Sequence, residues 1–222
     1  MKHGRILAYS LACLALLVAA GSAGAAERPT KPGPAEQILQ TVPLDAREPV
    51  WAPAEQLAAL GAEAKPALMA GLQHRNPGVV LAASYALLQL GEQRPAVDAL
   101  LEVMRSPQRP IRRRQEAAAL LVEHGGALGI ARTRMLLAKA DRAKDQALPE
   151  SLQVACARSL LKLTRNPADA GRLFRILREG KSERARSEAV LALAETGHFS
   201  DVAPPLKALA GRPGELGARA TV

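Results

Sequence analysis

The stretch that decides the fold is residues 60–91, LGAEAKPALMAGLQHRNPGVVLAASYALLQLG, and residues 90–125 repeat its plan as LGEQRPAVDALLEVMRSPQRPIRRRQEAAALLVEHG. Both copies open on Leu-Gly, carry a proline a few residues later, and continue as an amphipathic stretch to a polar turn that contains proline. A second amphipathic stretch then ends in glycine. Self-similarity of this kind indicates a repeat protein, in which each helix pair buries its apolar face against its neighbours.

Three further units follow the same plan. The third, residues 126–164, is longer and more basic, and its turn falls at residues 141–149. The fourth pairs residues 168–179 with 182–196, and the fifth opens with a helical stretch. Glycines end successive units, where they adopt a left-handed backbone without steric cost: Gly61, Gly91, Gly125 and Gly197. We expect the third unit, with its long turn, to be the least regular.

The spacing of apolar residues predicts the secondary structure of each unit. Val97, Leu100, Leu101 and Met104 follow the i, i+3, i+4, i+7 pattern of one helix face. Hydrophobic residues make up 48% of the chain but aromatic residues only 2%, which suits close-packed helices better than a β-sandwich or barrel. We therefore expect an all-α fold, a right-handed α-solenoid of about five antiparallel helix-pair repeats over residues 54–222.

The N-terminal residues have the order of a bacterial Sec-type signal peptide. A positive head precedes an uncharged apolar run at residues 6–20, which is shorter than the roughly 20 apolar residues that a membrane span needs. The small residues that follow predict cleavage after Ala25 or Ala26. Residues 1–26 therefore predict export to the periplasm or the medium, as a protein that does not span the membrane after cleavage.

The chain has two cysteines, Cys13 and Cys156. Acylation of Cys13 as a lipoprotein is an alternative to cleavage, but Ser10 stands where such signals usually place leucine, and the apolar run continues past the cysteine. Cleavage would leave Cys156 alone, so no intramolecular disulfide could form. Cys156 aligns with Ala83 and Ala189 of other units, which predicts a small core residue rather than a nucleophile.

Residues 27–53 separate the signal from the repeats and are rich in proline. The prolines are Pro29, Pro32, Pro34, Pro43, Pro49 and Pro53. They forbid a long helix and favour an extended tether. Residues 34–42 are long enough for two helical turns that would cap the first repeat. The predicted organisation is thus a signal peptide at 1–26, a Pro-rich linker at 27–53 and a repeat array at 54–222.

Several residues of the repeats together resemble a known family. They are Leu60, Gly61, Pro66, Ala67, Leu68, Asn76, Pro77, Ala82, Ala83, Ala86, Leu87, Arg184, Ala185, Arg186, Ala189, Ala192 and Leu193. In this combination the chain resembles the bacterial HEAT-like repeats, including the short type first noted in phycobilin lyases. The resemblance spans the whole predicted array and implies a scaffold that binds other proteins. It gives almost no information about a more specific function.

The resemblance also implies a role for particular arginines. In this family the second helix of a repeat commonly begins with Val-Arg, and the arginine ties adjacent repeats together. Arg112, Arg186 and Arg219 stand at that place here, whereas Val80 and Gln153 replace the arginine in the first and third units. The joints of those two units would then lack the polar tie.

No group of residues in the sequence predicts catalysis, a cofactor or a metal site. His74, His124 and His198 each stand at a helix end, where a positive ring interacts with terminal carbonyls, and no two of them are spaced as ligands. Trp51 lies just before the first repeat, where we expect it to cap the solenoid rather than to stack on a ligand. The expected protein is therefore not an enzyme.

The strongest local feature is positive charge. The net charge is +9, or about +7 once Lys2 and Arg5 leave with the signal peptide. The start of one helix carries four arginines: Arg109, Arg112, Arg113 and Arg114. The third unit adds Arg132, Arg134, Lys139, Arg142 and Lys144. The four arginines predict a basic patch, interpreted either as a solvated face attracted to an anionic envelope surface or as a binding site for an anionic polymer.

Two functions remain open after this reading. The favoured one is an exported, non-enzymatic scaffold that binds another protein in the cell envelope. Val222 falls where Tyr85 stands in the first unit, so the last helix stops halfway and we expect the chain to be a fragment. The alternative is therefore the docking region of a larger secreted hydrolase or peptidase. Nucleic acid is not an expected partner, because it is a poor candidate outside the cytoplasm and no aromatic residues are interleaved with the arginines for base stacking. Export also argues against a bilin-lyase activity.

Overall fold

The computed structural model describes residues 32–45, 47–143, 148–211 and 220, and of residues 142 and 143 only the backbone. Within these residues the secondary structure is helical, without strands, as the sequence predicts. The predicted signal peptide with Ala25 and Ala26, the linker residues up to 31, and Arg219 and Val222 lie outside the described residues.

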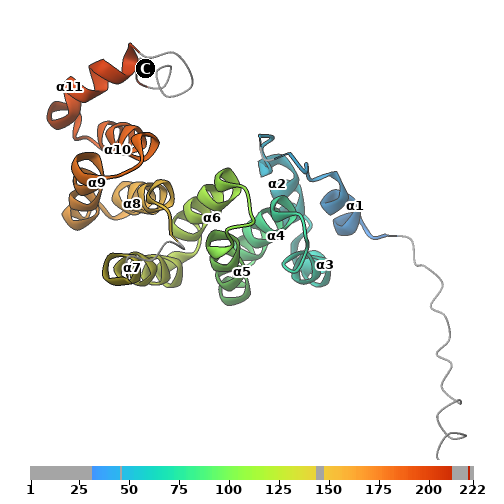
Figure 1. The fold of residues 1–222 in the computed structure, drawn as a ribbon. Helices are drawn as coiled ribbons and strands as arrows, with labels where there is room; N and C mark the ends of the chain where they lie inside the picture. Colours follow the sequence, from blue (N-terminus) through green and yellow to red (C-terminus); the bar gives the residue numbers. More distant parts are fainter. Residues whose placement is uncertain (1–31, 46, 144–147, 212–219, 221–222) are drawn as a thin grey trace, which may run out of the picture. The chain divides into compact units, whose positions relative to one another are not determined.

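The helices follow one another with short connections (Figure 1). Their bounds are α1 (Pro34–Thr41), α2 (Trp51–Ala59), the 3-10 helix η1 (Gly61–Ala64), α3 (Lys65–Gly71), α4 (Pro77–Gln89), α5 (Gln93–Arg105), α6 (Ile111–Glu123), α7 (Gly126–Ala143), α8 (Glu150–Thr164), α9 (Pro167–Glu179), α10 (Glu183–Glu195) and α11 (Phe199–Ala210).

The helices pack as stacked pairs. The helices α2, α4, α6, α8 and α10 contact one another in that order, and we call them the even row. Each of α3, α5, α7 and α9 packs against the even-row helix that follows it, and α5, α7, α9 and α11 pack against the one before. Neighbours in the chain are thus neighbours in space, which is the arrangement of an α-solenoid. The predicted all-α solenoid is confirmed.

The array begins earlier than the predicted boundary at residue 54. Helix α1 packs against α2 and α3, and α2 packs against α4 as the first member of the even row. The prolines of this segment do not prevent helix formation, because Pro34 and Pro53 lie in the first turns of α1 and α2. Backbone N–H groups in a first turn have no partner within the helix, so a proline there sacrifices no hydrogen bond.

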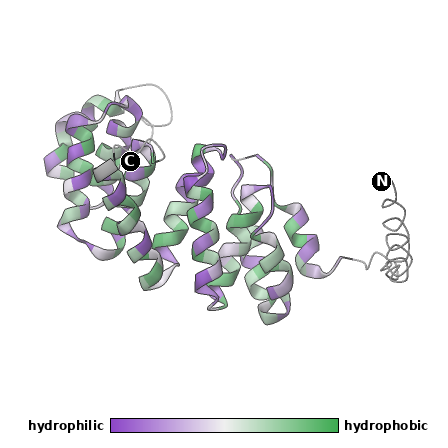
Figure 2. Cartoon of the chain, turned by 60° about the horizontal axis from the view of Figure 1, so that its bottom comes forward, coloured by the Kyte–Doolittle hydropathy of each residue, from purple (hydrophilic) through white to green (hydrophobic). Residues whose placement is uncertain are grey.

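The core is continuous in sequence but divides at α8. One cluster of buried apolar residues extends from α1 to α8, and a second extends from α8 to α11. Leu152, Cys156 and Leu160 of α8 belong to the first cluster, and Val154 and Leu161 belong to the second. Figure 2 shows the apolar and polar sides that these helices carry. Helix α8 therefore joins the two halves of the array by burying a different face in each.

Helix starts follow local sequence signals. Asn76 caps α4 by accepting a hydrogen bond from the N–H of Gly78 at 2.8 Å, and Asn166 caps α9 in the same way from Ala168 at 2.9 Å. Both asparagines precede a proline in the first helical position. The Asn-Pro pair thus satisfies one free donor and presets the backbone of the next residue.

Three of the units end at the predicted glycines, each of which has a positive φ angle: Gly61 (φ 66°), Gly91 (φ 82°) and Gly197 (φ 95°). In the second unit the left-handed residue is Gly126 (φ 57°) and not Gly125, which corrects the sequence prediction. Gly125 is required for a different reason, because a Cβ built on it would collide with the carbonyl oxygen of Leu121. Gly125 is therefore needed because a side chain does not fit there, and Gly126 because its φ angle is positive.

Candidate functional site

The four arginines predicted as a basic patch do not form one surface. Arg113 is fully buried and Arg114 is 6% exposed. Arg109 is partly buried, and its guanidinium donates to the carbonyl oxygen of Arg75. Only Arg112 keeps a mostly exposed side chain, at 53%. The prediction of an exposed patch is wrong for Arg113 and Arg114, because successive residues on a helix point about 100° apart and these two face the packed interior.

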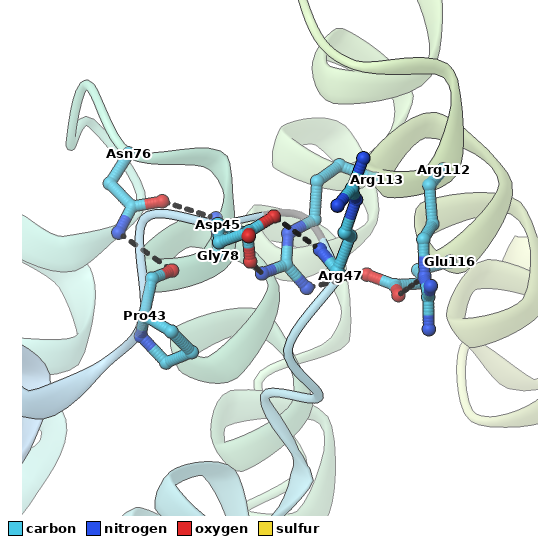
Figure 3. A network of polar contacts seen from close by, with 8 residues as sticks. All are labelled: Pro43, Asp45, Arg47, Asn76, Gly78, Arg112, Arg113 and Glu116. Carbon is cyan, nitrogen blue, oxygen red and sulfur yellow. Dashed lines mark hydrogen bonds and ion pairs between the residues drawn. The ribbon is translucent and has the colours of Figure 1, made fainter.

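Arg113 joins α6 to the connection between α1 and α2 (Figure 3). Its Nη1 pairs with Oε2 of Glu116 at 2.8 Å within α6, and its Nη2 donates to the carbonyl oxygen of Asp45 at 2.7 Å. Asp45 lies in the connection between α1 and α2, so the arginine links α6 to the N-terminal helix pair. Arg112, to which the resemblance assigned a tie between adjacent repeats, pairs instead with Glu116 of its own helix.

Asn76 reinforces the same connection from α4. Its Nδ2 lies 3.3 Å from the carbonyl oxygen of Val42 and 3.4 Å from that of Pro43, while its Oδ1 caps the helix (Figure 3). Buried carbonyls without a donor are costly, and Asn76 supplies donors for two of them. Asn76 and Arg113 together hold the loop after α1 on the array.

A groove with polar side chains lies on the even row. It encloses about 360 Å³ between α6, α8 and α10. Its lining residues are Arg112, Gln115, Glu116, Ala119, Val154, Ala155, Arg158, Ser159, Arg184 and Glu188. We call this surface the even-row groove. Three successive repeats contribute to it, so its shape depends on their stacking.

Ion pairs organise the even-row groove. Arg112 Nε lies 3.4 Å from Glu116 Oε1 in α6, and Arg184 Nε lies 2.9 Å from Glu188 Oε1 in α10. Both pairs have the i, i+4 spacing that places two side chains on one helix face. Arg158 of α8 adds a pair with Glu195 at 2.6 Å.

In the groove, a side chain of α6 contacts a side chain of α10 across the intervening helix α8. Gln115 Nε2 of α6 lies 3.5 Å from the carbonyl oxygen of Ser151 in α8 and 3.5 Å from Oε2 of Glu188 in α10. The part of α8 that lines the groove between them includes the small residue Ala155. The sequence analysis missed this site, although Arg112 with Glu116 and Arg184 with Glu188 repeat one pattern in two units. That repetition was the available signal.

A second hollow, of about 630 Å³, lies between α1, α3 and the start of α4. Its walls are mostly apolar and include Leu39, Val42, Ala67, Ala70 and Val79. Two polar residues at this hollow contact each other, because the N–H of Asn76 donates to Nδ1 of His74 at 3.0 Å. The lining of this hollow is therefore mainly apolar surface, with few polar groups that could bind a ligand.

One basic residue of the third unit, Arg134, enters an ion pair. Arg134 of α7 lies 3.7 Å from Oδ2 of Asp169, which is buried near the start of α9. Burial raises the pKa of Asp169, and the nearby Arg134 opposes that rise. Arg142 and Lys144 are residues whose side chains the structure does not describe.

The other singled-out residues occupy structural positions. Cys156 is fully buried, as predicted, and burial raises the pKa of its thiol to about 12, so the thiolate that a nucleophile needs does not form near neutral pH. Trp51 lies in the first turn of α2, and its ring meets Tyr85 edge to face at 6.3 Å between centroids. Tyr85 in turn meets the ring of His124 at 5.1 Å. These rings pack between repeats.

Among the residues that the structure describes, no three His, Cys, Asp or Glu side chains come together as metal ligands. The Nδ1 atom of His198 lies 3.4 Å from Oδ2 of Asp201 near the start of α11. None of the helices described combines the length and the apolar character needed to cross a bilayer.

Comparison with known proteins identifies the class of repeat. Residues 51–121, from α2 into α6, match the family model of HEAT repeats, which confirms the resemblance over that segment. No curated protein and no solved structure matches the chain significantly. Residues 51–121 are thus similar to HEAT repeats, helical scaffolds that commonly mediate protein interaction. Its assignment to the bacterial, phycobilin-lyase type stays a prediction.

Proposed function

We propose that this chain is an exported, non-enzymatic HEAT-repeat scaffold that binds another protein in the bacterial cell envelope through the even-row groove. The observation that carries the proposal is the groove itself, because one surface draws polar side chains from α6, α8 and α10. Repeat scaffolds bind partners along surfaces built by several successive units. The signal-like residues 1–26 support export.

The groove also suits binding better than catalysis. Arg112 and Arg184 are paired with Glu116 and Glu188, so the carboxylates of the lining are held in ion pairs with neighbouring arginines. Arginines held by ion pairs are common in recognition surfaces, where a fixed guanidinium binds with little loss of conformational freedom.

Site-specific photo-crosslinking in the native host tests the proposal. A photoreactive amino acid replaces Ala119 in the groove, and a matched variant carries it at Ala138, an exposed position on α7 outside the even row. We expect a discrete protein adduct in the envelope fraction from Ala119 but not from Ala138, with the same adduct lost on Arg112→Glu. Retention of the chain in the cytoplasm would overturn export, and identical labelling at both positions would overturn binding through the groove.

A further inference from the structure

The even-row groove presents a cationic surface although its charges are nearly balanced. The side chains of Arg112 and Arg184 are 53% and 63% exposed, whereas those of their partners Glu116 and Glu188 are only 18% and 11% exposed. The carboxylates therefore lie beneath the guanidinium groups. A partner that approaches the groove meets positive charge first.

The ion pairs also leave the outer ends of the guanidinium groups available. Each glutamate accepts from Nε, the nitrogen nearest the helix. Among the described residues, the Nη1 and Nη2 atoms of Arg112 and Arg184 make no hydrogen bond. A guanidinium has five N–H donors in a planar fork, so each of these arginines retains a pair of parallel donors suited to a carboxylate.

The two arginines belong to one hollow rather than to two separate surfaces. Gln115 reaches from α6 to Glu188 of α10, which shows that side chains of these two helices meet across α8. Arg158 lies on α8 in the same lining, with its side chain 37% exposed. A hollow of about 360 Å³ admits side chains of a chain segment but not a folded domain.

We infer that the even-row groove binds an acidic segment of the partner protein, with carboxylates of that segment paired to Arg112 and Arg184. This inference rests on the proposed scaffold function and specifies the chemistry of its partner. Glu116 and Glu188 hold the two guanidinium groups in place before binding, so fewer rotamers are lost when the acidic segment arrives. Attraction between the groove and the segment weakens as salt is added.

The test uses the purified chain and a fluorescein-labelled decaglutamate peptide, with decaglutamine as the neutral comparison, followed by fluorescence anisotropy. The variant Arg112→Gln/Arg184→Gln removes two charges from the groove. Its matched control, Arg94→Gln/Arg105→Gln, removes two exposed charges from α5 in the other row of helices. We expect decaglutamate to bind the wild type and the control alike, decaglutamine to bind neither, and the groove variant to bind about tenfold more weakly.

The outcomes separate this inference from the function on which it rests. Equal weakening in both double variants would show attraction to net charge and would overturn the inference. Binding of inorganic phosphate, or of phosphatidylglycerol vesicles, with the same dependence on Arg112 and Arg184 would also overturn it, in favour of a simple anion or a lipid surface. A protein adduct from Ala119 without decaglutamate binding would leave the scaffold function intact and reject only the acidic segment. Circular dichroism verifies that every variant is folded.

Discussion

At the residue scale, Arg113 shows how a charge can serve the fold rather than a ligand. The guanidinium is fully buried yet makes two strong contacts, with Glu116 and with the carbonyl oxygen of Asp45. Its Nε has no hydrogen-bond partner among the described residues, which is a cost that the other contacts must outweigh. A buried ion pair of this kind is sensitive to the loss of one partner.

Replacement of Arg113 by methionine is expected to lower the free energy of unfolding by roughly 2–4 kcal/mol. The reason is that the Asp45 carbonyl oxygen and Oε2 of Glu116 lose their hydrogen-bond donor in a desolvated site. The matched variant is Arg112→Met, which removes the neighbouring exposed member of the same cluster and should change stability by about 0–1 kcal/mol. Urea denaturation followed by circular dichroism measures both. Similar losses for the two variants would contradict the role assigned to Arg113.

At the element scale, two asparagines with the same local role differ in their surroundings. Asn76 and Asn166 each cap a helix that begins with proline. Asn76 is buried and also donates to the carbonyl oxygens of Val42 and Pro43, whereas the cap bond of Asn166 to Ala168 is exposed. The local signal is the same, and tertiary contact distinguishes the two.

We expect Asn166→Ala to destabilise the protein by about 1 kcal/mol, the ordinary value of a lost cap. Asn76→Ala should destabilise it by roughly 2–3 kcal/mol, because two carbonyls in the loop after α1 lose a donor as well. Hydrogen exchange adds a local readout: the amides of α1 should exchange faster in Asn76→Ala and remain unchanged in Asn166→Ala. Equal stability losses with unchanged exchange in α1 would argue against the tie.

At the scale of the whole molecule, the two core clusters meet at α8. Each helix pair contacts its nearest neighbours, so stability in such an array is a sum of local terms and interfaces. Leu100 of α5 and Leu173 of α9 are both completely buried, one in each cluster. They therefore offer equivalent perturbations on the two sides of α8.

Truncation of either leucine to alanine is expected to lower stability by about 2–5 kcal/mol. Leu173→Ala should increase hydrogen exchange mainly in α9–α11, and Leu100→Ala mainly in α3–α6, because opening propagates through neighbouring interfaces first. Exchange that rises uniformly along the chain in both variants would instead identify a single cooperative unit without a division at α8.

The sequence by itself determined the features that depend on local interactions. Asn-Pro pairs, glycines and the helical spacing of apolar residues specify where α4 and α9 begin and where several helices end, because capping, backbone conformation and amphipathic patterning act within a few residues. The same signals indicate an all-α repeat fold and the burial of Cys156, which follows from its alignment with core alanines.

Only the tertiary structure decided which polar residues belong to the surface. Arg112 and Arg113 are adjacent in sequence, but the rotation of about 100° per residue turns one toward solvent and the other into the joint with Asp45. The even-row groove likewise arises from residues on three helices that are separated in the chain. Such a surface depends on how successive repeats stack, and stacking is the sum of many weak contacts between elements that no local pattern encodes.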